Sequence, residues 1–378
     1  MLNIEKITLA MTESSLNQSA IAELCKVSRE AVSNWLSGQS VPRPLKLKAL
    51  ANTLGLSIDE IQQPRKFKST PVVAYRTQSR VPATEESLKA AEEIAYHLKE
   101  LVPFVVGESL FVPPHLENPS TDDSYIRKVT EQIRSRLGMS PLTPITRDQL
   151  IGLHHSFGSI LVPVLWSGEK IGHENALSIY LPESKSSWVV LSLNAHNDDF
   201  NYWLAHELGH CYSLHSLRDE EGEAFAERFA QELLFPYKSA LEALEKFKTS
   251  ANAMEHAEYL AKMHCISVVT VVRQVDRVAK ELDGEKCGLE ADQFWENWKS
   301  SRHLVPTVAQ SLFGPDEPSI EGYIDHTEKY FNTPVFKALS EWQLREGGRS
   351  PAFIASTLNI DLLDAYELSK ILFKRRSN

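Results

Sequence analysis

The stretch that decides the fold of most of this chain is Tyr202–His215, which reads YWLAHELGHCYSLH. On an α-helix, residues four apart lie about 40° and one turn apart, so His206 and His210 would direct their imidazole rings at one point. Glu207 would lie beside them, close enough to reach a water molecule held there without itself binding the ion. The pattern predicts a helix that holds zinc through two histidines and carries a general base.

A third ligand is needed, because catalytic zinc usually takes three protein ligands and a water molecule. The next helical pattern, EGEAFAERFAQELLFP at 221–236, offers Glu223 within the angular range of its apolar stripe. A carboxylate on a buried face costs free energy unless it meets a cation. We therefore predict Glu223 as the third ligand and Glu220 as the second choice. Glu227, one turn further on, is predicted to orient a ligand histidine.

Two apolar stretches precede the histidine helix, ALSIYLP at 176–182 and SWVVLSLN at 187–194, with polar residues between them. Their composition predicts a β-hairpin. We expect the strand from Trp188 to Asn194 to be an exposed sheet edge that aligns an extended substrate by strand addition.

The rest of the chain has mainly helical periodicity. Helices are expected through most of 86–138, with a proline-rich break at 112–123, then over 199–215 and 219–235, and in segments after Pro236. The predicted fold class is therefore mainly α with a small β-sheet (α+β).

The N-terminal residues 17–61 predict a separate helical core. Two short helices would meet at a tight turn, with Ser28 capping the second and Gly38 providing the turn after it. The residues expected to be buried are Ala22, Val27, Val32, Trp35, Leu47, Leu50, Ala51, Leu54 and Ile61. This part of the chain resembles the Xre/phage-repressor type of helix-turn-helix. The resemblance lies in a pattern that runs from a glutamine at 18 through V-S-x-x-x-V-S-x-W to a glycine.

That resemblance implies a recognition helix in the major groove of double-stranded operator DNA, in a protein that often acts as a homodimer. The side chains it assigns to base edges are Arg29, Glu30 and Asn34, with Gln18 and Ser33 near phosphate or supporting the base contacts. A helix-turn-helix that binds protein instead of DNA is the alternative.

Charge is unevenly distributed along the chain. Residues 1–84 hold eleven Lys or Arg and six Asp or Glu, a net charge of +5, whereas the remainder holds 29 and 44, a net charge of −15. The stretch 65–80 contains five basic residues and no acidic one (Arg65, Lys66, Lys68, Arg76 and Arg80). Such a segment suits contact with phosphate, or a solvated linker.

These patterns divide the chain into four parts. They are a helix-turn-helix domain at 1–63, a basic linker at 64–85, a domain at 86–280 that carries the predicted zinc site, and a C-terminal helical region at 281–378. No apolar run approaches the roughly 20 residues that a bilayer requires, so we expect a soluble cytoplasmic protein with no membrane contact. The four cysteines stand singly, which indicates reduced thiols.

The sequence HELGHCYSLH, followed by E-x-x-A-x-x-F-A-x-x-L-L-x-P from Glu223 to Pro236, resembles the ImmA/IrrE family of metallopeptidases. The resemblance extends over roughly 125–280. It implies a zincin-like domain in which His206, His210 and Glu223 hold Zn²⁺ and Glu207 is the catalytic base. It also implies a protein substrate: relatives cut helix-turn-helix repressors in stress, phage or mobile-element responses, so the substrate here would be the chain itself or a partner repressor.

Two other functions fit the same pattern. The chain could be a non-proteolytic Xre-type transcription factor whose metallopeptidase fold senses a small ligand. It could also be the antitoxin-like regulatory half of a toxin–antitoxin or phage-defence pair.

Overall fold

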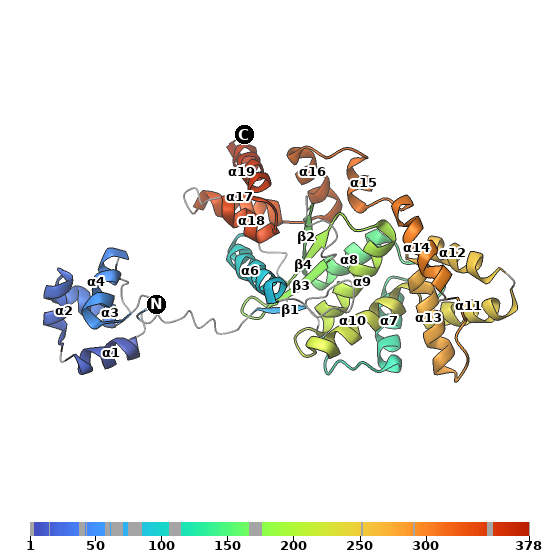
Figure 1. The fold of residues 1–378 in the computed structure, drawn as a ribbon, viewed down its shortest axis with the longest axis horizontal. Coiled ribbons are helices and arrows are strands. Elements are labelled where there is room, and N and C mark those ends of the chain that lie inside the picture. The colour runs from blue at the N-terminus through green and yellow to red at the C-terminus, as the bar shows by residue number, and fades with distance from the viewer. Residues whose placement is uncertain are drawn as a thin grey trace. The chain divides into compact units, whose positions relative to one another are not determined.

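The computed structural model describes residues 4–14, 16–37, 42, 44–56, 61, 71–74, 85–105, 115–165, 176–250, 252–289, 292–345 and 351–377 (Figure 1). The chain divides into two compact units, 1–70 and 71–378. Gly38 and the five basic residues of the 65–80 stretch lie outside the described residues. Within the described part of the chain, no helix combines the length and the apolar character that crossing a membrane requires.

The first unit is a small helical core. Its helices are α1 (Ile4–Glu13), α2 (Gln18–Cys25), α3 (Arg29–Leu36) and α4 (Pro44–Leu54). The hydroxyl of Ser28 accepts a hydrogen bond from the backbone N–H of Ala31 at 3.1 Å, so the predicted cap of α3 is confirmed. Of the residues predicted to be buried, all are buried except Val27, which packs half-buried against the same core.

The second unit contains a four-stranded sheet in the order β1-β3-β4-β2. The strands are β1 (Val72–Ala74), β2 (Ser159–Val164), β3 (Ala176–Leu181) and β4 (Ser186–Ser192). β3 and β4 pair antiparallel from Ala176↔Leu191 to Leu181↔Ser186, which confirms the predicted hairpin. Figure 1 shows the four strands in the middle of this unit.

The prediction that the strand from Trp188 to Asn194 forms an exposed edge is wrong. β4 lies inside the sheet, since β2 pairs with it in parallel from Ser159↔Ser187 to Val164↔Ser192. Every residue of β4 is buried, as is usual for a strand covered on both faces. β2 is not among the predicted strands, and its Pro163 argues against a central strand. The proline is tolerated because β2 is an edge strand.

Helices account for most of the second unit. In chain order they are α6 (Glu85–Leu101), η1 (Val102–Phe104), α7 (Asp123–Arg136), α8 (Arg147–Phe157), α9 (Asn197–Ser213), α10 (Asp219–Leu234), α11 (Tyr237–Thr249), α12 (Ala253–His264), α13 (Val268–Glu281), α14 (Asp292–Ser301), η3 (Arg302–Leu304), α15 (Val308–Phe313), α16 (Ile320–Phe331), α17 (Val335–Arg345), α18 (Pro351–Leu358) and α19 (Leu362–Ser377). The chain is thus mainly helical with one small sheet.

The residues after 280 share the hydrophobic core of the second unit, and no boundary between units falls at 280. The Tyr323 hydroxyl donates to the Pro163 carbonyl at 2.6 Å, and the Thr333 hydroxyl donates to the Leu161 carbonyl. Both carbonyls belong to the edge strand β2. Because buried backbone groups must find hydrogen-bond partners, the C-terminal helices complete the sheet edge and pack as part of the same unit.

His154 couples α8 to the histidine-bearing helix α9. Its ring is fully buried, and its Nε2–H donates to the Leu204 carbonyl at 2.9 Å. Burial lowers the pKa of His154 from 6.5 to about 4, against the smaller raising effect of the Leu204 hydrogen bond. The ring is therefore neutral in the folded protein at neutral pH.

His154 is expected to make the second unit less stable as pH falls from about 6.5 to about 4. In the unfolded chain His154 takes up a proton near its ordinary pKa of 6.5, whereas in the fold it does so only near 4. Below about pH 6.5 the unfolded state therefore binds more protons, and this residue alone lowers the free energy of unfolding by up to about 3 kcal/mol. Above that pH its contribution is fully present.

The measurement is denaturant unfolding of wild type and His154→Gln, each near pH 7.5 and near pH 5. Glutamine is chosen because its side-chain amide can still donate to the Leu204 carbonyl but does not titrate. Wild type should lose more stability than the variant between the two pH values. Contributions of other titrating groups cancel in this difference, including the opposing one from Asp199, whose pKa burial raises to about 6. An equal loss in both proteins would contradict the assignment.

Candidate metal centre

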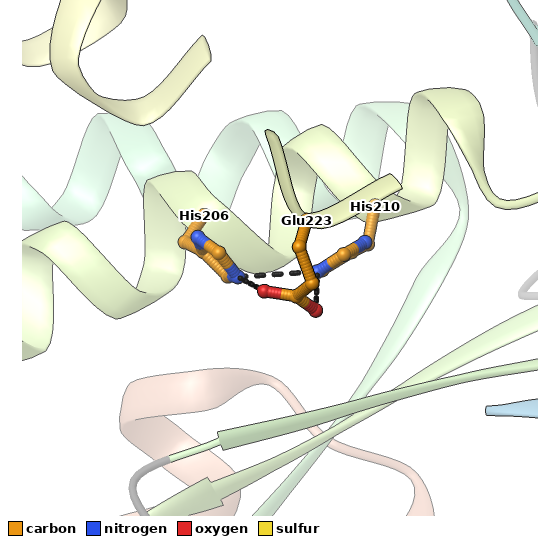
Figure 2. A group of neighbouring side chains, drawn as sticks. All are labelled: His206, His210 and Glu223. Atoms are coloured by element: carbon orange, nitrogen blue, oxygen red, sulfur yellow. Dashed lines mark hydrogen bonds and ion pairs between the residues drawn. The ribbon is translucent and has the colours of Figure 1, made fainter. Parts of the chain in front are cut away.

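Helices α9 and α10 bring the predicted metal ligands together. His206 and His210 are fully buried on α9, and Glu223, which is partly exposed, reaches them from α10. Figure 2 shows the Glu223 carboxylate between the two imidazole rings, with all three side chains directed toward the strands of the sheet. Among the described residues, these three form the group whose ligand atoms all lie within 4.8 Å of one another.

The separations between these atoms fit a bound zinc ion. The two Nε2 atoms are 3.1 Å apart, Glu223 Oε1 lies 3.1 Å from His210 Nε2, and Glu223 Oε2 lies 3.5 Å from His206 Nε2. Zinc binds nitrogen and oxygen at roughly 2.0–2.2 Å, so ligand atoms at two corners of a tetrahedron are about 3.3 Å apart. Two imidazoles and one carboxylate are also a donor set that zinc prefers.

The carboxylate of Glu223 is held in its charged form. Burial raises its pKa, but hydrogen bonds and electrostatic interactions with His206 and His210 outweigh that effect and leave the pKa well below its ordinary value. An ionised carboxylate beside two imidazole nitrogens is ready to bind a cation.

Glu207 is buried beside the ligand cluster, only 3% exposed. Its backbone carbonyl accepts a hydrogen bond from the Ser178 hydroxyl of β3 at 3.4 Å, so the sheet lies directly against this part of α9. Cys211, one residue after His210, is a neutral thiol, because burial raises its pKa to about 12.

The close approach of α9 and α10 depends on Gly209, which lies inside the HELGH motif. A Cβ atom at this position would stand 2.9 Å from the Cα of Ala226 and 3.2 Å from Cδ1 of Phe229. No real Cβ atom comes that close to backbone, so the glycine sets the distance between the two helices. This role of Gly209 was not predicted from the sequence, although a glycine between two ligands and an alanine in the apolar stripe of the next helix are signals of it.

Gly209→Ala is expected to disturb both stability and metal binding. The added methyl group would push α10 away, and Glu223 lies on α10 one turn before Ala226, so the carboxylate would move with it. Overpacking of this kind costs about 1–3 kcal/mol in unfolding free energy. Zinc affinity should fall on the order of tenfold, the amount that corresponds to about 1.4 kcal/mol.

The matched control is Gly152→Ala on α8, where a Cβ would meet no atom within 4 Å. This control should keep its zinc affinity and unfold at the same or a slightly higher denaturant concentration, since alanine favours helix. Both variants are compared by zinc titration and denaturant unfolding. If Gly209→Ala bound zinc as tightly as the control, the packing explanation would be wrong.

The first turn of α9 is held by residues of the C-terminal region. Arg302 of η3 pairs with Asp198 at 2.6 Å and with Asp199. The His196 ring, next to the helix start, donates to the Val305 carbonyl at 2.7 Å. This region, for which the sequence predicts only helices, thus anchors the helix that carries both histidines.

The remaining predicted residues near the cluster lie as follows. Glu220 is exposed and is not part of the three-residue group. Glu227 is half-buried, and its charge acts on the guanidinium of Arg277. Its predicted role in orienting a ligand histidine stays a prediction.

The predicted DNA-contacting residues lie on the surface of the first unit. Arg29, Glu30 and Ser33 are exposed on α3, and Asn34 on the same helix is half-buried. Gln18, also half-buried, opens α2. The buried residues of α3, Val32 and Trp35, face the core, so the polar side chains are on its outer side.

The first unit is similar to a known protein family. Residues 9–61 match the family model for a helix-turn-helix, a span that includes α2, α3 and α4. No curated protein matches this chain. The first unit therefore carries a helix-turn-helix of the Xre type, which supports a DNA-binding regulator, and the function of the second unit rests on its own geometry.

Proposed function

We propose that this chain is a DNA-binding transcription regulator whose second unit is a zinc-dependent endopeptidase. The observation that carries the proposal is the convergence of two imidazole nitrogens and one carboxylate, 3.1–3.5 Å apart, with the buried acid Glu207 next to one of them in the chain. This arrangement combines a cation site with a group that can accept a proton.

The chemistry follows from the roles of four side chains. His206, His210 and Glu223 would hold the ion, which when bound supplies a water of pKa about 7 and polarises a peptide carbonyl. The Glu207 carboxylate would accept the proton of the attacking water and then deliver it to the nitrogen of the leaving amine. A helix-turn-helix repressor, either this chain or a partner, is the proposed protein substrate.

The test is direct. Purified protein should contain about one zinc ion per chain, lose it to a chelator and regain it on zinc addition. The reloaded protein should cleave an unstructured protein such as labelled casein, or its own chain. Protein that binds no zinc under these conditions would refute the proposal.

The first unit is proposed to place α3 in the major groove of operator DNA. Its outer face presents Arg29, which can donate to guanine O6 and N7, and Asn34, which can pair with adenine. Glu30 can accept from cytosine N4, while Gln18 and Ser33 would contact phosphate or support the base contacts. A single α3 carries one cation, so binding as a homodimer would supply further affinity.

Replacing Arg29 and Asn34 together with alanine is expected to weaken specific binding by about 1–3 kcal/mol for each base that is no longer recognised. The measurement is titration of an operator selected from random DNA, at several salt concentrations. The matched control is Lys48→Ala, which removes one positive charge from an exposed position on α4. Equal affinities for the double variant and the control would count against groove binding by α3.

A further inference from the structure

The outer edge of β3 is occupied by a segment from outside the predicted metallopeptidase domain. β1, Val72–Ala74, pairs antiparallel with β3 in the register Val72↔Tyr180, Val73↔Ile179 and Ala74↔Ser178. These residues fall within the predicted linker 64–85. In the structure they belong to the second unit and form the edge strand of its sheet.

β1 lies beside one of the two helices that carry the metal cluster. Side chains of directly paired residues share one face of a sheet, so Ala74 lies on the same face as Ser178. The Ser178 hydroxyl bonds to the Glu207 carbonyl, so that face is the one packed against α9. β1 also lies against α10, the helix of Glu223, and against α6.

The β3 edge is the one suited to accept a peptide. An added strand needs a free sheet edge. The opposite edge, β2, is capped by the hydroxyls of Tyr323 and Thr333. The β3 edge lies next to α9, so a peptide paired there would extend the sheet beside the helix that carries His206 and His210.

We propose that the outer edge of β3 binds the extended peptide substrate, antiparallel to β3, and that Val72–Ala74 of the same chain is the resident occupant that a substrate must displace. This inference rests on the proposed function. The occupant is short and only half-buried in all three residues, unlike the fully buried β4. A three-residue edge strand is held by few interactions and opens at low free-energy cost.

Displacement sets the apparent affinity of the site. If the β3 edge is open in a fraction of molecules, the apparent Kd equals the intrinsic Kd divided by that fraction. Locking β1 in place must therefore weaken peptide binding, and loosening β1 must strengthen it. A ligand that needs only the metal ion is unaffected by either change.

A disulfide bond between β1 and β3 would hold β1 in place. Val73 and Ile179 face each other across the two strands, and the Cα atoms of such antiparallel pairs are about 4.5–5.5 Å apart, within the range of disulfides. The double variant Val73→Cys with Ile179→Cys is made in the full chain, with the exposed Cys265 replaced by serine to avoid links between chains. The oxidised and reduced forms of one protein are then matched controls.

Two probes are titrated into the zinc-loaded protein. Acetohydroxamate binds zinc and needs no strand pairing, whereas a Val-Val-Ala tripeptide hydroxamate needs both zinc and the β3 edge. Formation of the disulfide should weaken binding of the tripeptide hydroxamate on the order of tenfold or more and leave the affinity for acetohydroxamate unchanged. Val73→Asp places a charge against the core and so loosens β1. It should strengthen binding of the tripeptide hydroxamate relative to wild type by a similar factor.

Hydrogen exchange gives a readout independent of affinity. In wild type, amides of β1 should lose protection when the tripeptide binds and keep it when acetohydroxamate binds. If acetohydroxamate binds but the tripeptide binds equally well to oxidised and reduced protein, the inference is overturned and the metal centre stands. If the protein takes up no zinc, the proposed function and this inference both fail.

Discussion

Glu223→Gln is expected to weaken zinc binding on the order of a hundredfold or more. Glutamine keeps the size of the side chain but removes the negative charge of the carboxylate, whose Oε1 lies 3.1 Å from His210 Nε2. Loss of partners that only orient metal ligands already costs about 10–100-fold in metal affinity, so loss of a ligand should cost at least as much. The two histidines alone leave the ion with an incomplete set of protein ligands.

The measurement is competition with a zinc-binding dye, together with the thermal midpoint with and without zinc. A ligand that binds only the folded state raises stability, so zinc should raise the midpoint of wild type and have little effect on the variant. Glu220→Gln is the matched control, because it changes the same charge on the same helix at an exposed position. If Glu220→Gln lost zinc and Glu223→Gln kept it, the ligand assignment would be wrong.

Glu207→Gln is expected to keep zinc, but its rate of peptide cleavage should fall by about 10²–10⁴-fold. The amide retains the shape of the buried side chain, but it cannot accept a proton from the attacking water. Metal content should be unchanged, because Glu207 is outside the three-residue ligand group. The separation of binding from rate distinguishes a general base from a ligand.

The reaction is followed by cleavage of labelled casein and by fragmentation of the chain itself, with zinc content measured on the same samples. Glu221→Gln, an exposed substitution on α10, is the control that should behave as wild type. A variant that cleaves as fast as wild type would remove Glu207 from the mechanism. Wild-type protein that holds zinc but cleaves no substrate would favour the ligand-sensing regulator.

The sequence by itself determined the features that depend on neighbours in the chain. A four-residue spacing places His206 and His210 on one helical face, and the apolar stripe of the next helix places Glu223 toward them. The β3–β4 hairpin and the Ser28 cap likewise follow from apolar, β-branched composition and from a side chain that reaches a backbone three residues away.

Only the tertiary structure decided how these elements assemble. Strand order made β4 central, recruited Val72–Ala74 to the edge of β3 and joined the C-terminal helices to β2. The approach of Gly209 to Ala226 fixed where Glu223 meets the histidines. Each of these interactions satisfies backbone groups or fills space between segments far apart in the chain. A local pattern reports which residues share a face, but not which distant surface that face meets.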